Sequence, residues 1–355
     1  MTTTPRGATT LLDVSGLQKF FPIRQGIFRR TVGYVRAVDD VSFTVTKGET
    51  LALVGESGCG KTTTARAILR AVEPTGGTVK FLSQSGEVID VTNVPRKALQ
   101  PLRKEMQLIF QDPWSSLNPR MTLLDLVGEP LLVHGVSSAS ERQARVEALL
   151  KRVGLRPEYM GRYPHAFSGG QRQRIGIARA LALRPSLVVA DEPVSALDVS
   201  VQAQILNLLL ELQNEFGLTY LFVSHDLAVV KHLSDRVAVM YAGKIVEMGV
   251  AAQVFAAPRH PYTEALLSAV PEPNPDTKSR RIVLEGDVPD PANLPTGCAF
   301  HPRCRHVIDR CLTEAPVLQA GADGHLVRCH RAAELTLAGV VPPHEKGEPT
   351  TRTLS

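Results

Sequence analysis

The feature that most constrains this chain is a glycine-rich stretch, Gly55–Thr62, which fits the pattern G-x-x-x-x-G-K-[ST]. It follows an apolar run at Thr50–Val54 and precedes a predicted helix at Thr62–Ala71. Glycines let backbone N–H groups converge on phosphate oxygens, and a helix N-terminus adds positive potential there. The stretch therefore predicts a phosphate loop for a nucleotide. The expected contacts are Gly55, Glu56, Ser57, Gly58, Cys59, Gly60, Lys61, Thr62 and Thr63.

Two acidic residues after another apolar run supply the second half of such a site. Leu187–Ala190 reads as a buried strand, and Asp191 and Glu192 follow it directly. A carboxylate at a strand end can hold Mg²⁺ through water, which we expect of Asp191 together with Thr62. Glu192 is placed to polarise an attacking water, a task worth about 10²–10⁴ in rate. Apolar runs that end in acid are common, so the neighbouring motifs decide the matter.

Short apolar runs alternate with amphipathic stretches along most of the chain, which predicts a largely parallel α/β sheet. The expected strands are Leu11–Phe21, Val41–Val45, Thr50–Val54, Met106–Phe110, Leu187–Ala190 and Thr219–Val223. The expected helices are Thr62–Ala71, Ser140–Val153, Gln171–Leu183 and Val199–Phe216. The segment Arg24–Arg36 reads as a basic, turn-like insert. No internal repeat is visible, so one nucleotide domain is expected.

The segment Phe167–Gln171, Phe-Ser-Gly-Gly-Gln, resembles the signature motif of the ABC ATPases. The order of the other motifs matches that family as well: Gln111 after a strand, then the signature, Asp191-Glu192, Ser195–Asp198 and finally His225. These resemble the Q-loop, Walker B, D-loop and switch histidine. The resemblance implies a P-loop NTPase of ABC type, with a parallel-sheet core, an antiparallel β subdomain and a helical signature subdomain.

The resemblance also implies a site shared between two subunits. Ser168, Gly169, Gly170 and Gln171 would complete the ATP site of a partner, and Asp198 would lie at the same interface. His225 would contact the γ-phosphate as a catalytic residue beside Glu192, and Gln111 would sense it through Mg²⁺ or water. Family members stack an aromatic ring on adenine; Phe21 is the candidate by spacing, with Phe20 second and core packing of either ring the alternative.

Three features resemble the oligopeptide/dipeptide importers, specifically their second, F-like ATPase subunit. They are Phe20–Pro22 followed by Val32–Asp39, the segment Gln111–Pro119 after the Q-loop, and His260–Thr263 with the cysteine-containing segment that follows. The likeness covers residues 11–331. It implies a second ATPase subunit, two membrane permeases that dock on Asp112–Val133, and an extracytoplasmic solute-binding protein. Trp114 belongs either to that docking surface or to the interior of the helical subdomain.

Four of the five cysteines, Cys298, Cys304, Cys311 and Cys329, crowd one stretch near the C-terminus. In a cytosolic protein such a cluster is more often a metal site than a disulfide framework. Four thiolates suit Zn²⁺ or a 4Fe–4S cluster. The resemblance favours a structural 4Fe–4S cluster, with Zn²⁺ and buried free thiols as alternatives.

Composition limits where the protein can act. The apolar runs are far shorter than the roughly 18 residues that a membrane span needs, and residues 1–6 do not resemble a signal peptide. We therefore expect an intracellular protein whose membrane role is peripheral, and the resemblance to importer ATPases implies the cytoplasmic face of the cell (inner) membrane. The net charge of +5 permits nucleic-acid contact, but no run of five Lys or Arg residues exists, so no nucleic-acid partner is expected.

Domain limits and two competing functions complete the expectations. We expect a disordered N-terminus at 1–10, an ABC nucleotide-binding domain at 11–260 with its helical subdomain at about 112–180, an extension at 261–335 and a disordered tail at 336–355. A soluble ABC ATPase acting on nucleic acid or ribosomes usually has two fused nucleotide domains or a coiled-coil insertion, and neither is visible. A small-molecule kinase has no use for Ser168–Gln171. The transported solute is not encoded in these motifs.

Overall fold

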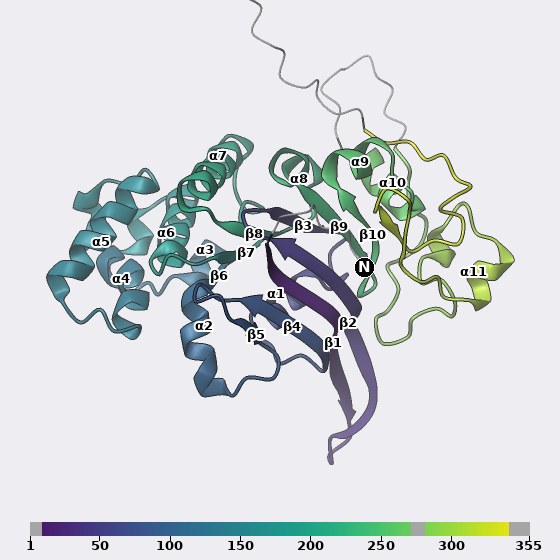
Figure 1. Cartoon of the computed structure of the whole chain (residues 1–355), viewed down its shortest axis with the longest axis horizontal. Coiled ribbons are helices and arrows are strands. Elements are labelled where there is room, and N and C mark those ends of the chain that lie inside the picture. Colours follow the sequence, from purple (N-terminus) through teal and green to yellow (C-terminus); the bar gives the residue numbers. More distant parts are fainter. Residues whose placement is uncertain (1–8, 271–280, 341–355) are drawn as a thin grey trace, which may run out of the picture.

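The computed structural model describes residues 9–270 and 281–340, arranged around one eight-stranded sheet (Figure 1). Its strand order is β11-β12-β10-β9-β3-β8-β7-β6, and the five strands from β9 to β6 run parallel. Their bounds are β3 Thr50–Val54, β6 Met106–Ile109, β7 Leu187–Asp191, β8 Thr219–Ser224 and β9 Arg236–Tyr241, and the antiparallel β10 spans Lys244–Val250. Every residue of β3, β7 and β8 is buried, as continuous apolar runs require of strands covered on both faces.

A second, antiparallel sheet packs beside the first in the order β2-β1-β4-β5. The strands are β1 Thr10–Gln25, β2 Arg30–Thr46, β4 Gly76–Leu82 and β5 Val88–Asp90. Buried side chains of β1 and β2, such as Leu12, Leu17 and Val41, share one apolar core with β3, α1 (Lys61–Ile68) and α2 (Leu99–Glu105). This core fixes the antiparallel sheet against the helix that follows the phosphate loop.

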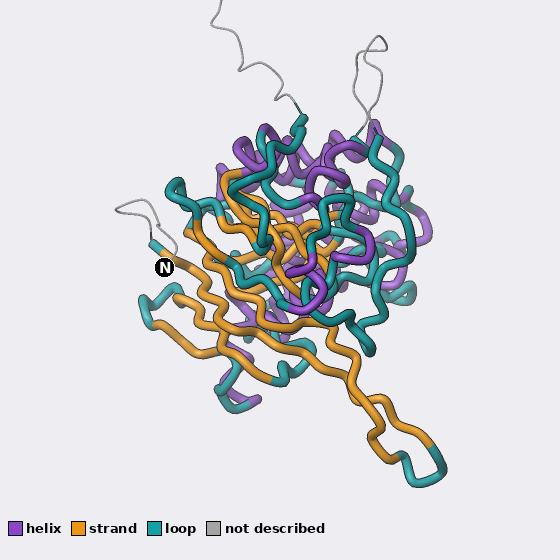
Figure 2. The backbone as a smooth tube through the Cα atoms, turned by 90° about the vertical axis from the view of Figure 1, so that its right-hand side faces the viewer, coloured by secondary structure: helices purple, strands orange, loops and turns teal. Residues whose placement is uncertain are grey.

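The expected turn-like insert at Arg24–Arg36 is instead mostly strand. β1 and β2 continue as a hairpin that projects from the body of the protein and turns at residues 26–29 (Figure 2). Ile27 and Phe28 at its tip are almost fully exposed. Sequence patterning missed the hairpin because neither face of it is buried, so its strands lack the alternation of apolar and polar residues that marks a half-buried strand.

Figure 1 shows one group of helices toward each end of the long axis, with others, such as α1, between them. The helical region nearest β6 and β7 contains α3 Pro113–Ser116, α4 Leu123–Val133, α5 Ala139–Arg152 and α6 Gly169–Leu181, with 3₁₀ turns at Pro157–Gly161 and Pro164–Ala166. Thr122 and Ser138 cap α4 and α5 by accepting backbone N–H bonds, which explains where these helices begin. α7 (Val199–Phe216) and α8 (Leu227–Leu233) connect the parallel strands.

The C-terminal segment adds to the main sheet as well as packing against it. Its elements are α9 Ala251–Ala256, α10 Pro261–Ser268, α11 Asp309–Thr313, β11 Gln319–Ala320 and β12 Leu326–Val327, with 3₁₀ turns at His301–Arg303 here and at Arg96–Ala98 earlier in the chain. β12 pairs with β10 through Glu247 and Met248. Of the two expected disordered ends, residues 1–8 and 341–355 lie outside the described residues.

Candidate functional site

The phosphate loop has a backbone that only glycine adopts easily. Gly55, Gly58 and Gly60 all have positive φ. A Cβ added at Gly55 would overlap the carbonyl oxygen of Met240, and one at Gly60 would overlap that of Ala37. The two glycines are therefore required by neighbouring strands as well as by the turn itself.

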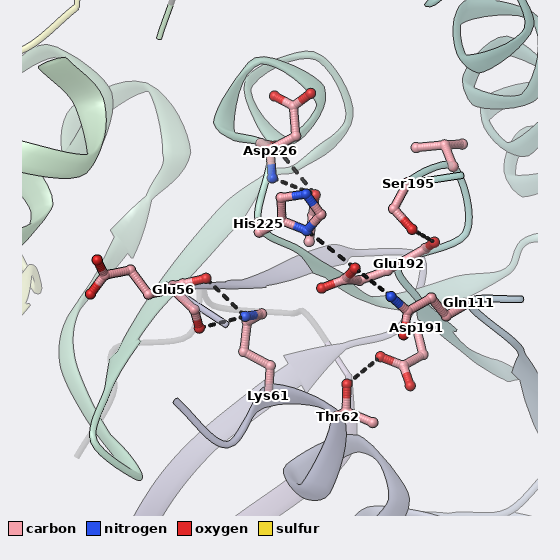
Figure 3. A network of polar contacts seen from close by, with 12 residues as sticks. Glu56, Lys61, Thr62, Gln111, Asp191, Glu192, Ser195, His225 and Asp226 are labelled. Atoms are coloured by element: carbon pink, nitrogen blue, oxygen red, sulfur yellow. Dashed lines mark hydrogen bonds and ion pairs between the residues drawn. The ribbon is translucent and has the colours of Figure 1, made fainter. Parts of the chain in front are cut away.

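Lys61 and Thr62 follow the loop, and Thr62 faces Asp191 at the end of β7 (Figure 3). Lys61 Nζ donates hydrogen bonds to the carbonyl oxygens of Gly55 at 2.8 Å and Glu56 at 2.9 Å. Thr62 Oγ1 donates to Asp191 Oδ1 at 2.8 Å. A hydroxyl and a carboxylate at hydrogen-bond distance are oxygen donors of the type Mg²⁺ prefers, so this pair fits the predicted metal role chemically.

Glu192 is the meeting point of three elements (Figure 3). Its Oε2 accepts a hydrogen bond from Gln111 Nε2 at 2.9 Å and lies 3.1 Å from His225 Nδ1. Gln111 follows β6, Glu192 follows β7 and His225 follows β8, so the parallel register brings the three together at the carboxyl edge of the sheet. Glu192 also has a positive φ of 46°, a strained conformation for a residue with a side chain.

Burial shifts the acid–base properties of two residues at this site. The pKa of the Asp191 carboxyl is raised by desolvation, although the Thr62 hydrogen bond and the Arg66 guanidinium, 3.8 Å away, oppose that rise. Burial likewise raises the pKa of the Cys59 thiol, which keeps this loop cysteine protonated and unreactive. The Asp191 carboxylate is thus poorly solvated, so a cation bound beside it would stabilise its charged form.

The signature segment forms the start of α6 rather than part of this network. Ser168 caps the helix by accepting the N–H of Gln171, and the Gln171 side chain accepts the N–H of Ser168 in return. Ser168 is exposed, as is Asp198 at the start of α7. The described chain therefore presents these polar groups outward, away from its own phosphate loop contacts.

Gly170 lets α6 and α7 approach each other closely, and this gives a testable stability prediction. A Cβ at Gly170 would overlap Cγ1 of Val201 on α7. We expect Gly170→Ala to lower the free energy of unfolding by about 1–3 kcal/mol through overpacking, measured by urea denaturation. Gly176→Ala on the same helix meets nothing within 4 Å; this control should gain about 0.5–1 kcal/mol from helix propensity. Equal effects of the two changes would contradict the packing argument.

Phe21 lies on β1 with 39% of its surface exposed, and Lys19 Nζ is 4.8 Å from its ring centroid. The ring of Phe20, the neighbouring residue on the strand, lies 5.9 Å from the Arg36 guanidinium instead.

Trp114 on α3 is 65% exposed, and the guanidinium of Arg172 stacks on its ring, 3.1 Å from the ring centroid. The Trp114 ring is therefore at the surface, stacked on Arg172 of α6, and is not packed in the interior of the helical region.

Sequence reasoning missed two residues that contact the phosphate loop from the C-terminal segment. Arg303 forms a bidentate ion pair with Glu56, at 2.7 and 3.0 Å. The hydroxyl of Tyr262 accepts the backbone N–H of Glu56 at 2.8 Å. No spacing rule links residue 56 to residue 303; the only signal was that Tyr262 lies within His260–Thr263, a segment already noted for its family likeness.

The predicted metal site at Cys298, Cys304, Cys311 and Cys329 is wrong. Within residues 9–270 and 281–340, no group of three or more His, Cys, Asp or Glu side chains is arranged to hold a metal ion. All four are free cysteines, and Cys298 and Cys304 pack against an apolar cluster around Phe300. Burial raises the pKa of Cys298 to about 11 and also raises that of Cys304 and Cys329. Cys298 and Cys304 therefore serve as small apolar groups in this cluster.

Comparison with known proteins places this geometry in a family. The model of the ABC transporter family matches residues 38–195, and that of the oligopeptide/dipeptide transporter C-terminal region matches residues 246–311. The oligopeptide transport ATP-binding protein AppF of Bacillus subtilis is 53% identical over 90% of this chain and 97% of its own length. The chain belongs to the ATP-binding subunits of ABC transporters. The dipeptide transport ATP-binding protein DppF of Haemophilus influenzae is 48% identical over 93% of this chain and 99% of its own length.

Solved structures confirm the predicted fold of this ABC ATP-binding subunit. The dimeric, post-hydrolysis ATP-binding cassette MJ0796, bound to ADP and phosphate, superposes with a TM-score of 0.59 at 29% identity, covering 68% of this chain and 99% of that one. The likeness to ABC ATP-binding proteins supports ATPase activity. These relatives are named for ATP binding, and nothing in their names supports a 4Fe–4S or zinc centre. Among the helices described, none combines the length and apolarity needed to cross a membrane.

Proposed function

We propose that this ABC ATP-binding subunit couples ATP hydrolysis to the import of dipeptides or oligopeptides through partner permeases. The observation that carries the proposal is the convergence of Gln111 and His225 on Glu192, beside the Thr62–Asp191 pair. The solute class rests on the relatives, which are named for oligopeptide and dipeptide transport.

The residues of the phosphate loop have distinct roles in this proposal. The backbone N–H groups of the loop, from Gly58 to Thr63, bind phosphate oxygens, and Lys61 moves from its carbonyl partners to the β- and γ-phosphates. Thr62, Asp191 and Gln111 would hold Mg²⁺, which supplies charge neutralisation on the phosphates when bound. Glu192 polarises the attacking water, and His225 contacts the γ-phosphate and orients that carboxylate.

A second subunit completes the site. Ser168, Gly169 and Gly170 offer donors at the exposed start of α6, where a helix N-terminus favours an anion. We propose that they and Gln171 bind ATP held by the partner ATPase, with Asp198 at the same interface. The dimeric state of MJ0796 supports this arrangement, and the F-like resemblance favours a distinct partner subunit. Phe21, exposed at the base of the hairpin, stacks on adenine in this proposal.

The membrane partners are proposed to dock on residues 112–133, which follow Gln111 directly. The exposed Trp114 ring on α3 belongs to that surface, held in place by Arg172. Movement of Gln111 on nucleotide binding would thereby reach the permeases. The subunit then lies at the inner face of the cell membrane as a peripheral protein, and an extracytoplasmic binding protein delivers the solute to the permeases.

We propose that the chain divides into an ABC nucleotide-binding domain at 11–260 and a C-terminal extension at 261–335.

Affinity purification and uptake test this proposal together. We expect the tagged chain, expressed in its host, to co-purify with two membrane permeases and a second ATPase subunit. Deleting its gene should lower uptake of labelled dipeptides or oligopeptides to background, and the wild-type gene should restore it. Uptake of a labelled free amino acid is the control and should not change. Co-purification of RNA or ribosomes without permeases would contradict the proposal and favour the soluble ABC ATPase.

A further inference from the structure

Glu56, the second residue of the phosphate loop, is held on both its backbone and its side chain by the C-terminal segment. The hydroxyl of Tyr262 accepts its N–H, and the guanidinium of Arg303 grips both carboxylate oxygens. Its own carbonyl oxygen accepts a hydrogen bond from Lys61 Nζ. Arg303, Tyr262 and Lys61 are therefore linked to one another through their contacts with Glu56.

The Arg303 side of this contact is built to be rigid. Its side chain is only 6% exposed, and it extends from the 3₁₀ turn His301–Arg303. Next to it, the rings of Tyr241, Tyr262 and Phe300 pack with centroid distances between 4.6 and 5.5 Å. Such packing leaves few rotamers open, so the guanidinium meets Glu56 already oriented.

Electrostatics gives this contact a consequence beyond fold stability. Glu56 places a carboxylate in a loop that must accept the triphosphate of ATP, and like charges repel strongly where solvent is restricted. A buried bidentate arginine neutralises that carboxylate locally, and the Glu56 side chain points away from Lys61 (Figure 3). The same contact fixes the carbonyl oxygen of Glu56, which accepts a hydrogen bond from Lys61 Nζ.

We infer that Arg303 is a positioning residue of the nucleotide site, through which the C-terminal segment sets the affinity of the phosphate loop for ATP. The inference rests on the proposed ATP site and adds to it a regulatory input. Any partner that pulls the His301–Arg303 turn away from Glu56 would weaken ATP binding without touching the nucleotide.

A double-mutant cycle on the full chain tests the inference. We expect Arg303→Ala to weaken ATP binding about tenfold, the scale of one lost charge-assisted hydrogen-bonded pair, measured by calorimetric titration with MgATP. Arg303→Lys, which keeps the charge, should recover part of that loss. Combining Arg303→Ala with Glu56→Gln should also restore much of the affinity, because the carboxylate that Arg303 neutralises is then absent.

Arg305→Ala is the matched control, because Arg305 lies in the same segment and pairs with Glu264 at 2.7 Å instead of with the loop. It should leave ATP affinity unchanged. Equal ATP affinity of Arg303→Ala and wild type would overturn the inference, and so would a double variant as weak as the single one, which indicates a purely structural role. A wild-type chain that binds no ATP would instead contradict the proposed function, which keeps the two failures apart.

Discussion

Replacing Glu192 with glutamine is expected to slow ATP hydrolysis at this subunit's site by about 10²–10⁴-fold, the usual contribution of a positioned general base. The amide keeps the size of the side chain and can still meet Gln111 and His225, but it cannot take a proton from water. ATP affinity should therefore stay near the wild-type value. Single-turnover hydrolysis of labelled ATP in the assembled transporter, with binding measured separately, checks both parts.

The Glu192 experiment has a matched control in Glu211→Gln, an exposed carboxylate on α7 that lies outside the site. That change should leave both hydrolysis and affinity as they are. Residual steady-state turnover in the Glu192 variant would report a working site on the partner subunit, whereas complete loss would mean that this site dominates. A hydrolysis rate unchanged in single turnover would refute the role given to Glu192.

Lys61→Ala is expected to weaken ATP binding by about two orders of magnitude, within the roughly 2–5 kcal/mol typical of removing one partner from a desolvated charge pair. Lys61 is 4% exposed, and its ammonium is held by two carbonyl oxygens, which are weaker partners than phosphate oxygens. Titration with MgATP measures the loss, and thermal unfolding shows whether the loop itself has been disturbed.

The control for Lys61 is Lys151→Ala, which removes an exposed lysine paired with Glu147 on α5. Surface pairs of this kind contribute little, so ATP affinity and melting temperature should both hold. If the Lys61→Ala variant unfolds at a normal temperature and still binds ATP as the wild type does, this ammonium is not a phosphate ligand.

The parallel core was predictable because its signal is local and strong. Thr50–Val54 and Leu187–Ala190 are buried on both faces, so an unbroken apolar run was enough to locate them. Gln111 and His225 were named by the resemblance to the ABC ATPases, and the parallel sheet explains why they meet Glu192, since the residues after β6, β7 and β8 lie at one edge of it. Even the helix Val199–Phe216 was predicted with its observed bounds.

The missed features depend on contacts that leave no periodic trace. The hairpin beyond Phe21 has no buried face, so its extended strands read as a turn-like insert. The cysteines suggested a metal site by their type, their crowding in the sequence and the family resemblance, whereas Cys298 and Cys304 pack as small apolar groups against the Phe300 cluster. The Glu56–Arg303 pair joins distant parts of the chain, and a single sequence offers no measure of which arginine meets which acid.

The pairing of β12 with β10 affects the order in which the protein can finish folding. β10 is synthesised well before Leu326 and Val327, so its outer side lacks its β12 partner while most of the C-terminal segment is being made. An unpaired sheet edge is a template for association with another chain. A nascent or truncated subunit that stops short of β12 would therefore carry an open edge at Glu247 and Met248, which the two residues of β12 close in the full chain.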